Sequence, residues 1–149
     1  MNLLEKIEQE MKTALKSGDS VRSETLKMIK SDISYEKGKT GKEITDELVL
    51  EIVGRSAKRR RESIKEFQKG GRQDLVDIET KQLAVVEEFL PKQMTEEEID
   101  AHITNKLAAL GTITQKEIGR VMGEIMKELK GKADGSAVKA ILSKKIGGN

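Results

Sequence analysis

The chain has 149 residues, of which 36% are charged, 36% are hydrophobic and only 2% are aromatic. Its formal net charge of +2 excludes a protein that attracts polyanions by bulk charge, so any such surface must be a local patch. The absence of cysteine excludes disulfides and thiolate chemistry, and no apolar run approaches the ~20 residues that span a bilayer. We therefore expect a cytoplasmic protein with no membrane partner.

Seven segments carry the apolar period of an α-helix, and none shows the alternation of a strand. Asp74 is expected to cap the fourth of these helices, and Pro91 to prevent its continuation. The run GKTGK is the most loop-like piece of this half. The four helices before the proline are expected at about residues 3–17, 19–37, 45–69 and 74–90.

Three further helices are expected after the proline. The spacing Thr-x-x-Glu, which is that of a capping box, occurs at 95–98 and again at 114–117, where the fifth and sixth helices should begin. The fold class predicted from the sequence is all-α. We expect an N-terminal four-helix domain (1–92) and a small C-terminal three-helix domain (93–149).

Reactive side chains are scarce in this sequence. His102 is the single histidine, and it lies on a predicted helix where a surface position explains it. A metal site lacks a second histidine, and the glycines do not follow a strand with the spacing of a phosphate loop. The sequence therefore predicts no catalytic residue, no metal and no cofactor.

A basic run lies within the third predicted helix, where steps of three and four place cationic side chains on one stripe. Like charges one turn apart, such as Arg61 and Lys65, destabilise a helix, and a bound polyanion would offset their repulsion. A solvated face in which Glu62 and Glu66 pair locally explains the same run, and the sequence leaves both interpretations open. The candidate phosphate contacts are Lys58, Arg61, Lys65 and Arg72.

A second basic feature is the stretch LKGKADGSAV (129–138), between the last two predicted helices. Gly131 suits the left-handed conformation that closes a helix, and Asp134 is expected to cap the next one with its carboxylate. That negative charge disfavours a phosphate at the helix start itself. We count Gly131, Asp134 and Gly135 as structural residues of the turn. The candidate nucleic-acid contacts around it are Lys127, Lys130, Lys132 and Lys139.

Two glycines lie four residues apart inside the sixth predicted helix. Gly119 and Gly123 each cost about 1 kcal/mol relative to alanine in a helix interior. Their spacing creates a smooth groove that another backbone can approach closely. We expect helix five or seven to fill this groove, with a partner protein as the alternative.

Four stretches resemble the YqeY family. They are RRESIKEFQKGGRQDLVDIE (60–79), FLPKQMTEEEI (89–99), IGRVMGEIM (118–126) and LKGKADGSAV (129–138). The motifs GKADG, GR.DLV and LP.Q carry the resemblance, which covers essentially the whole chain. One departure is Gln82, which stands where the family tends to have a second glutamate after the one matched by Glu79.

Members of this family are similar to the tail region of the B subunit of glutamine-dependent aminoacyl-tRNA amidotransferases. The resemblance implies a pair of helical domains and a role in holding the tRNA body, with the reactive sites elsewhere in that assembly. It predicts a non-catalytic tRNA-binding accessory module, whose partners are tRNA and an amidotransferase or another protein. A helical protein-interaction module is the first alternative. Part of a carbon–nitrogen ligase that uses glutamine as amide donor is the second, and no residue here carries that chemistry.

Overall fold

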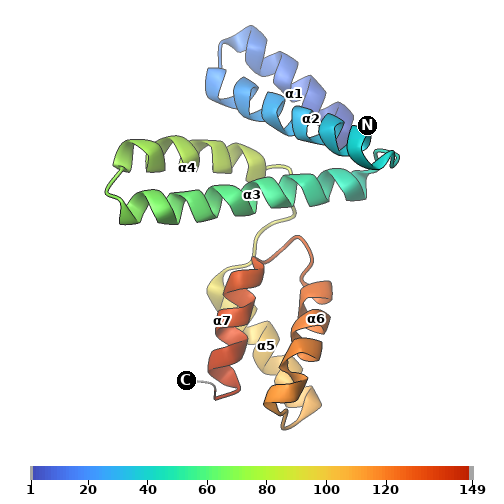
Figure 1. The fold of residues 1–149 in the computed structure, drawn as a ribbon, viewed down its shortest axis with the longest axis vertical. Coiled ribbons are helices and arrows are strands. Elements are labelled where there is room, and N and C mark those ends of the chain that lie inside the picture. Colours follow the sequence, from blue (N-terminus) through green and yellow to red (C-terminus); the bar gives the residue numbers. More distant parts are fainter. Residues whose placement is uncertain (1, 148–149) are drawn as a thin grey trace. The chain divides into compact units, whose positions relative to one another are not determined.

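The computed structural model describes residues 2–147, which form seven α-helices and one 3-10 turn, with no strand in that range (Figure 1). This confirms the predicted all-α class. No helix of the described part is long and apolar enough to cross a membrane. The elements are α1 (Leu3–Ser17), α2 (Ser20–Thr40), α3 (Asp46–Lys69), α4 (Gln73–Glu87), α5 (Glu96–Leu110), the 3-10 turn η1 (Gln115–Glu117), α6 (Ile118–Glu128) and α7 (Gly135–Lys145).

Capping interactions fix most helix ends where the sequence predicts them. The hydroxyl of Thr95 accepts a hydrogen bond from the Glu98 N–H at 3.1 Å, and the Glu98 carboxylate reaches back to the Thr95 N–H. Helix α2, in contrast, does not stop at Lys37 as expected. It continues to Thr40 and ends at Gly41, whose φ of 68° only glycine adopts at little cost.

Three other helix starts differ from expectation. Arg72, not Asp74, occupies the N-cap of α4, and the Asp74 carboxylate in the first turn binds the Arg72 guanidinium instead. Thr114 does form the predicted capping box, but a 3-10 turn precedes the regular α6 helix. Asp134 occupies the N-cap of α7, but its side chain makes no capping hydrogen bond.

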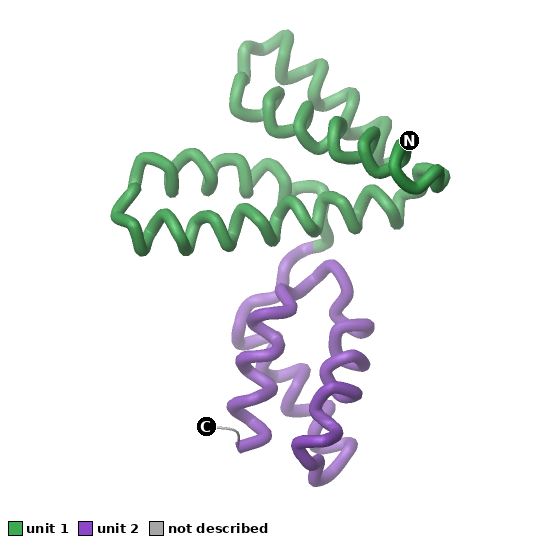
Figure 2. Tube along the Cα trace, in the orientation of Figure 1, with its two compact units in different colours: residues 1–91 green, residues 92–149 purple. Residues whose placement is uncertain are grey.

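The chain divides into two compact units, residues 1–91 and 92–149 (Figure 2). In the first unit, α1 pairs with α2 and α3 pairs with α4, and α2 also contacts both α3 and α4. The core of this unit is built from side chains that the helical period places inward, among them Ile7, Ile29, Val53 and Val86, all fully buried.

The second unit has its own core. Helix α7 contacts both α5 and α6. Ile103 of α5, Val121 and Ile125 of α6, and Val138 of α7 are completely buried there. Because each unit encloses a separate apolar cluster, each has its own source of hydrophobic stabilisation.

Candidate functional site

Three consecutive arginines of α3 leave the helix at different angles, because successive residues of a helix are about 100° apart. The exposed Arg59 turns to α2, while the buried Arg60 and the half-buried Arg61 turn to α4. The solvated-face interpretation expected local pairing with Glu62, and none of the three arginines pairs with it. The ion pairs join Arg59 Nη2 to Asp32 Oδ2 at 3.1 Å, Arg60 Nη1 to Glu79 Oε2 at 3.3 Å, and Arg61 Nη2 to Glu87 Oε1 at 3.3 Å.

The predicted stripe on α3 is therefore divided between ion pairs and exposed lysines. Lys58 and Lys65, seven residues apart on one face, are exposed. Arg61 is held by Glu87. Arg72 lies beyond the end of α3 and is bound by Asp74 two residues later, which lowers the pKa of the Asp74 carboxyl. Lys58 and Lys65 are thus the members of the stripe most available to a ligand.

The backbone of the LKGKADG turn (129–135) makes hydrogen bonds within the second unit. Gly131, at a φ of 76°, presents its carbonyl to the side-chain amide of Gln93, which donates at 2.7 Å. The Lys132 carbonyl accepts from the Met94 N–H, also at 2.7 Å. Two motifs of the sequence, LP.Q and GKADG, therefore meet in one hydrogen-bonded turn, while the side chains of Lys130 and Lys132 are exposed.

Helix α6 leaves a bare face open to solvent. Gly119 and Gly123 are exposed, and a Cβ atom added at either would meet nothing within 4 Å. The expectation that α5 or α7 fills this groove is therefore wrong, because those helices pack on the opposite side, against Val121 and Ile125. Lys127 is exposed one turn beyond Gly123, so the smooth face leads toward the lysines of the turn.

The bare face makes a testable prediction about stability. We expect Gly123→Ala to raise the free energy of unfolding by about 0.5–1 kcal/mol, because the helical φ suits alanine and the space is empty. The matched control is Gly131→Ala, which should lower it by about 1 kcal/mol because that residue is left-handed. Urea denaturation of both variants measures the two changes, and a destabilising Gly123→Ala would contradict an open face.

The single histidine belongs to an ion-pair cluster between α5 and α6. His102 Nε2 lies 2.6 Å from Glu128 Oε2, and Lys106 Nζ lies 2.6 Å from the other oxygen of the same carboxylate. The hydrogen bond from Lys106, followed by that of His102, lowers the pKa of Glu128. Within the described residues, no three carboxylate or imidazole groups are placed to hold a metal ion.

This cluster predicts a pH dependence of stability. A carboxyl with a lowered folded-state pKa stabilises the fold above its ordinary pKa, and that contribution disappears as the pH falls through the lowered value. The difference in Tm between the wild type and Lys106→Ala should therefore be present near pH 7 and shrink between about pH 5 and pH 3. Calorimetry across that range tests it, and a difference that grows in acid would refute it.

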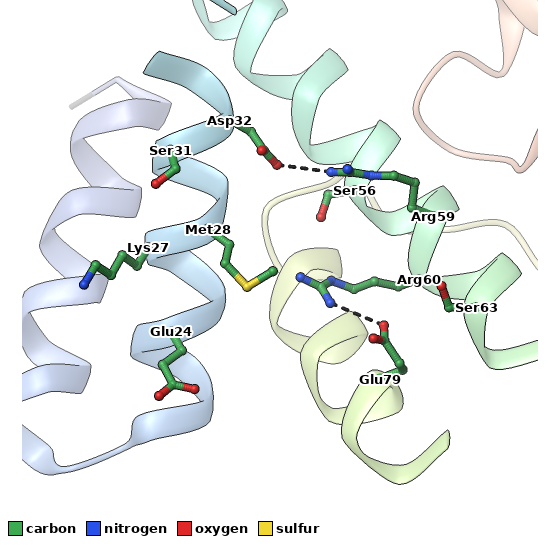
Figure 3. A pocket seen from close by; sticks show the side chains of 10 residues that line it. All are labelled: Glu24, Lys27, Met28, Ser31, Asp32, Ser56, Arg59, Arg60, Ser63 and Glu79. Atoms are coloured by element: carbon green, nitrogen blue, oxygen red, sulfur yellow. Dashed lines mark hydrogen bonds and ion pairs between the residues drawn. The ribbon is translucent and has the colours of Figure 1, made fainter. Parts of the chain in front are cut away.

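A cavity of about 620 Å³ lies between α2, α3 and α4 of the first unit (Figure 3). Arg60 and Glu79 form part of its wall, and Figure 3 shows the Arg60 side chain extending from α3 toward Met28 of α2. The sequence analysis gave no role to Arg60. The signal that could have identified it is Gln82, the position that departs from the family pattern, because its side-chain oxygen accepts from Arg60 Nη1 at 2.6 Å.

Comparisons with known proteins give consistent results. A sequence model of the family described as Yqey-like protein matches residues 4–146. The mitochondrial protein named altered inheritance of mitochondria protein 41 from Pyrenophora tritici-repentis is 31% identical over 147 residues, covering 97% of this chain and 78% of the relative. The protein of that name from Kluyveromyces lactis is 29% identical, with 92% and 78% covered. An uncharacterised protein of Schizosaccharomyces pombe is 33% identical over 92 residues, covering 61% of this chain and 74% of the relative.

Proposed function

Because the chain belongs to the YqeY-like family, we propose that it is a non-catalytic, tRNA-binding accessory module. The similarity of this family to the tail of the amidotransferase B subunit suggests the ligand. The observation that carries the proposal is the open face of α6, where Gly119 and Gly123 leave the backbone bare beside the exposed Lys127. A ribose–phosphate backbone can approach such a face closely while lysines meet its phosphates.

The composition supports recognition of shape over recognition of single-stranded bases. Aromatic residues make up 2% of the chain, so stacking platforms for unpaired bases are scarce. A folded RNA presents phosphates and ribose hydroxyls on a rigid surface, which lysines contact without reading the sequence. On this hypothesis, Lys132 and Lys139 extend the contact within the second unit, and Lys58 and Lys65 form a separate contact on the first.

The test is binding of labelled total tRNA over a salt series, for the wild type and a Lys127→Ala/Lys132→Ala double variant. Loss of two phosphate contacts should flatten the slope of log K against log salt by about 1.5–2. It should also weaken binding about tenfold at low salt. Lys12→Ala/Lys16→Ala, which removes two exposed lysines from α1, is the matched control for charge.

Two results would reject the tRNA hypothesis. One is wild-type binding no tighter than that of an arbitrary RNA duplex of the same length. The other is an equal effect of Lys127→Ala/Lys132→Ala and Lys12→Ala/Lys16→Ala on tRNA binding, which would show that only the net charge matters.

A helical protein-interaction module is the second candidate, and a stripe along α2 favours it. Val21, Met28 and Tyr35 lie seven residues apart and are 38%, 48% and 71% exposed. A repeat of seven suits the apolar seam of a partner helix. In this case Met28→Lys/Tyr35→Lys would abolish a complex with an amidotransferase that the wild type forms in size-exclusion chromatography, and would leave tRNA binding unchanged.

The compartment is also a proposal. The names of two relatives refer to mitochondria. We propose the cytoplasm for this chain, because its cysteine-free composition suits a reducing compartment. Imaging of the tagged full chain distinguishes the two compartments.

A further inference from the structure

The guanidinium of Arg60 has one edge in use and one edge without a partner. Its Nη1 donates to Glu79 Oε2 at 3.3 Å and to Gln82 Oε1 at 2.6 Å. Its Nε is buried and has no acceptor, in a residue that is only 7% exposed. A buried donor without an acceptor destabilises the fold, and an acceptor supplied by a ligand would remove that cost.

We propose that the cavity between α2, α3 and α4 binds the carboxylate of a small monoanionic molecule, through this edge of Arg60. The Nε–H and the neighbouring Nη2 of a guanidinium are parallel donors at the spacing of two carboxylate oxygens. The cavity volume of about 620 Å³ is within the range of small-molecule sites.

The charges around the cavity favour a monoanion over a polyanion. Three cationic residues line it, and so do three acidic ones, Glu24, Asp32 and Glu79, so the wall is neutral overall. Asp32 and Glu79 already neutralise Arg59 and Arg60 in part. A phosphate dianion would meet these carboxylates with two charges, whereas a carboxylate meets them with one and gains the same two hydrogen bonds.

The remaining lining selects a short, partly polar molecule. Ser31, Ser56 and Ser63 contribute hydroxyl groups, and Met28 contributes a flexible apolar side chain that adapts to the ligand. This combination suits a carboxylic acid with a hydroxyl group on a short carbon chain.

Gln82 makes the proposal specific. Its neutral amide gives Arg60 an acceptor without a second negative charge, so the guanidinium keeps an attraction for an incoming carboxylate. Glutamate at this position has nearly the same shape and would neutralise Arg60 from within. We therefore expect Gln82→Glu to remain folded and to bind carboxylates about tenfold more weakly.

The experiment follows the Arg60 Nε–Hε resonance of the full chain by ¹⁵N-edited NMR. Its burial slows exchange with water and makes the signal observable. Lactate, glycolate and acetate are the probes, acetamide is the neutral control and inorganic phosphate represents the competing anion class. We expect a saturable shift with lactate or glycolate at millimolar concentration, none with acetamide, and the weakening given above in Gln82→Glu.

Four outcomes would overturn the proposal. The first is no saturable shift of the Arg60 resonance with any carboxylate. The second is an equal shift with acetamide, which would show that charge plays no part. The third is stronger binding of phosphate than of every carboxylate. The fourth is carboxylate binding that Gln82→Glu leaves unchanged.

Discussion

Replacing Arg60 by methionine should lower the free energy of unfolding by about 2–3 kcal/mol. Methionine fills much of the same space, but it leaves the Glu79 carboxylate, which is only 22% exposed, without its cation. Gln82 loses the donor for its side-chain oxygen as well. Urea denaturation, followed by circular dichroism, measures the loss.

Two controls separate burial from charge. Arg59→Met removes the neighbouring arginine, whose side chain is 67% exposed, and should change stability by less than about 1 kcal/mol. In the double variant Arg60→Met/Glu79→Leu, no charge is left unpaired, and much of the lost stability should return. Equal effects of Arg59→Met and Arg60→Met would show that the pair between α3 and α4 is not buried in solution.

Ile125→Ala should unfold the second unit while the first stays folded. Ile125 is completely buried in a core supplied by three short helices, and a large-to-small change at such a site costs about 2–5 kcal/mol. A unit of residues 92–149 has little stability in reserve, because small domains bury a smaller fraction of their surface. Residue-resolved NMR should show collapsed signals from this unit and unchanged dispersion from residues 2–91.

The matched control is Ile29→Ala, which makes a similar cavity in the core of the first unit. It should perturb the signals of that unit alone. Simultaneous loss of both sets of signals in either variant would show that the two units unfold as one cooperative structure.

The helices could be predicted from the sequence because apolar period and capping chemistry are local. The boxes at Thr95 and Thr114 specify helix starts through residues three positions apart. One difference, at the start of α4, came from competition between partners. Asp74 could cap α4, but the adjacent Arg72 offers its carboxylate two charged hydrogen bonds.

The candidate site was predictable only in part. Periodicity places Lys58 and Lys65 on one exposed face of α3, and the structure has them there. The partner of each arginine depends on α2 and α4, which are distant in the sequence, so local spacing could not find Asp32 or Glu79. The spacing of Gly119 and Gly123 indicates a bare face, but it does not say whether another helix covers it.

The divergence of Arg59, Arg60 and Arg61 also limits how the gene can change in length. One residue inserted into α3 just before them would rotate all three by about 100° and bring the buried guanidinium to a neighbouring direction. Insertions should therefore be rare in this part of α3 across related sequences. They should be tolerated at residues 41–43, where the chain between α2 and α3 is exposed.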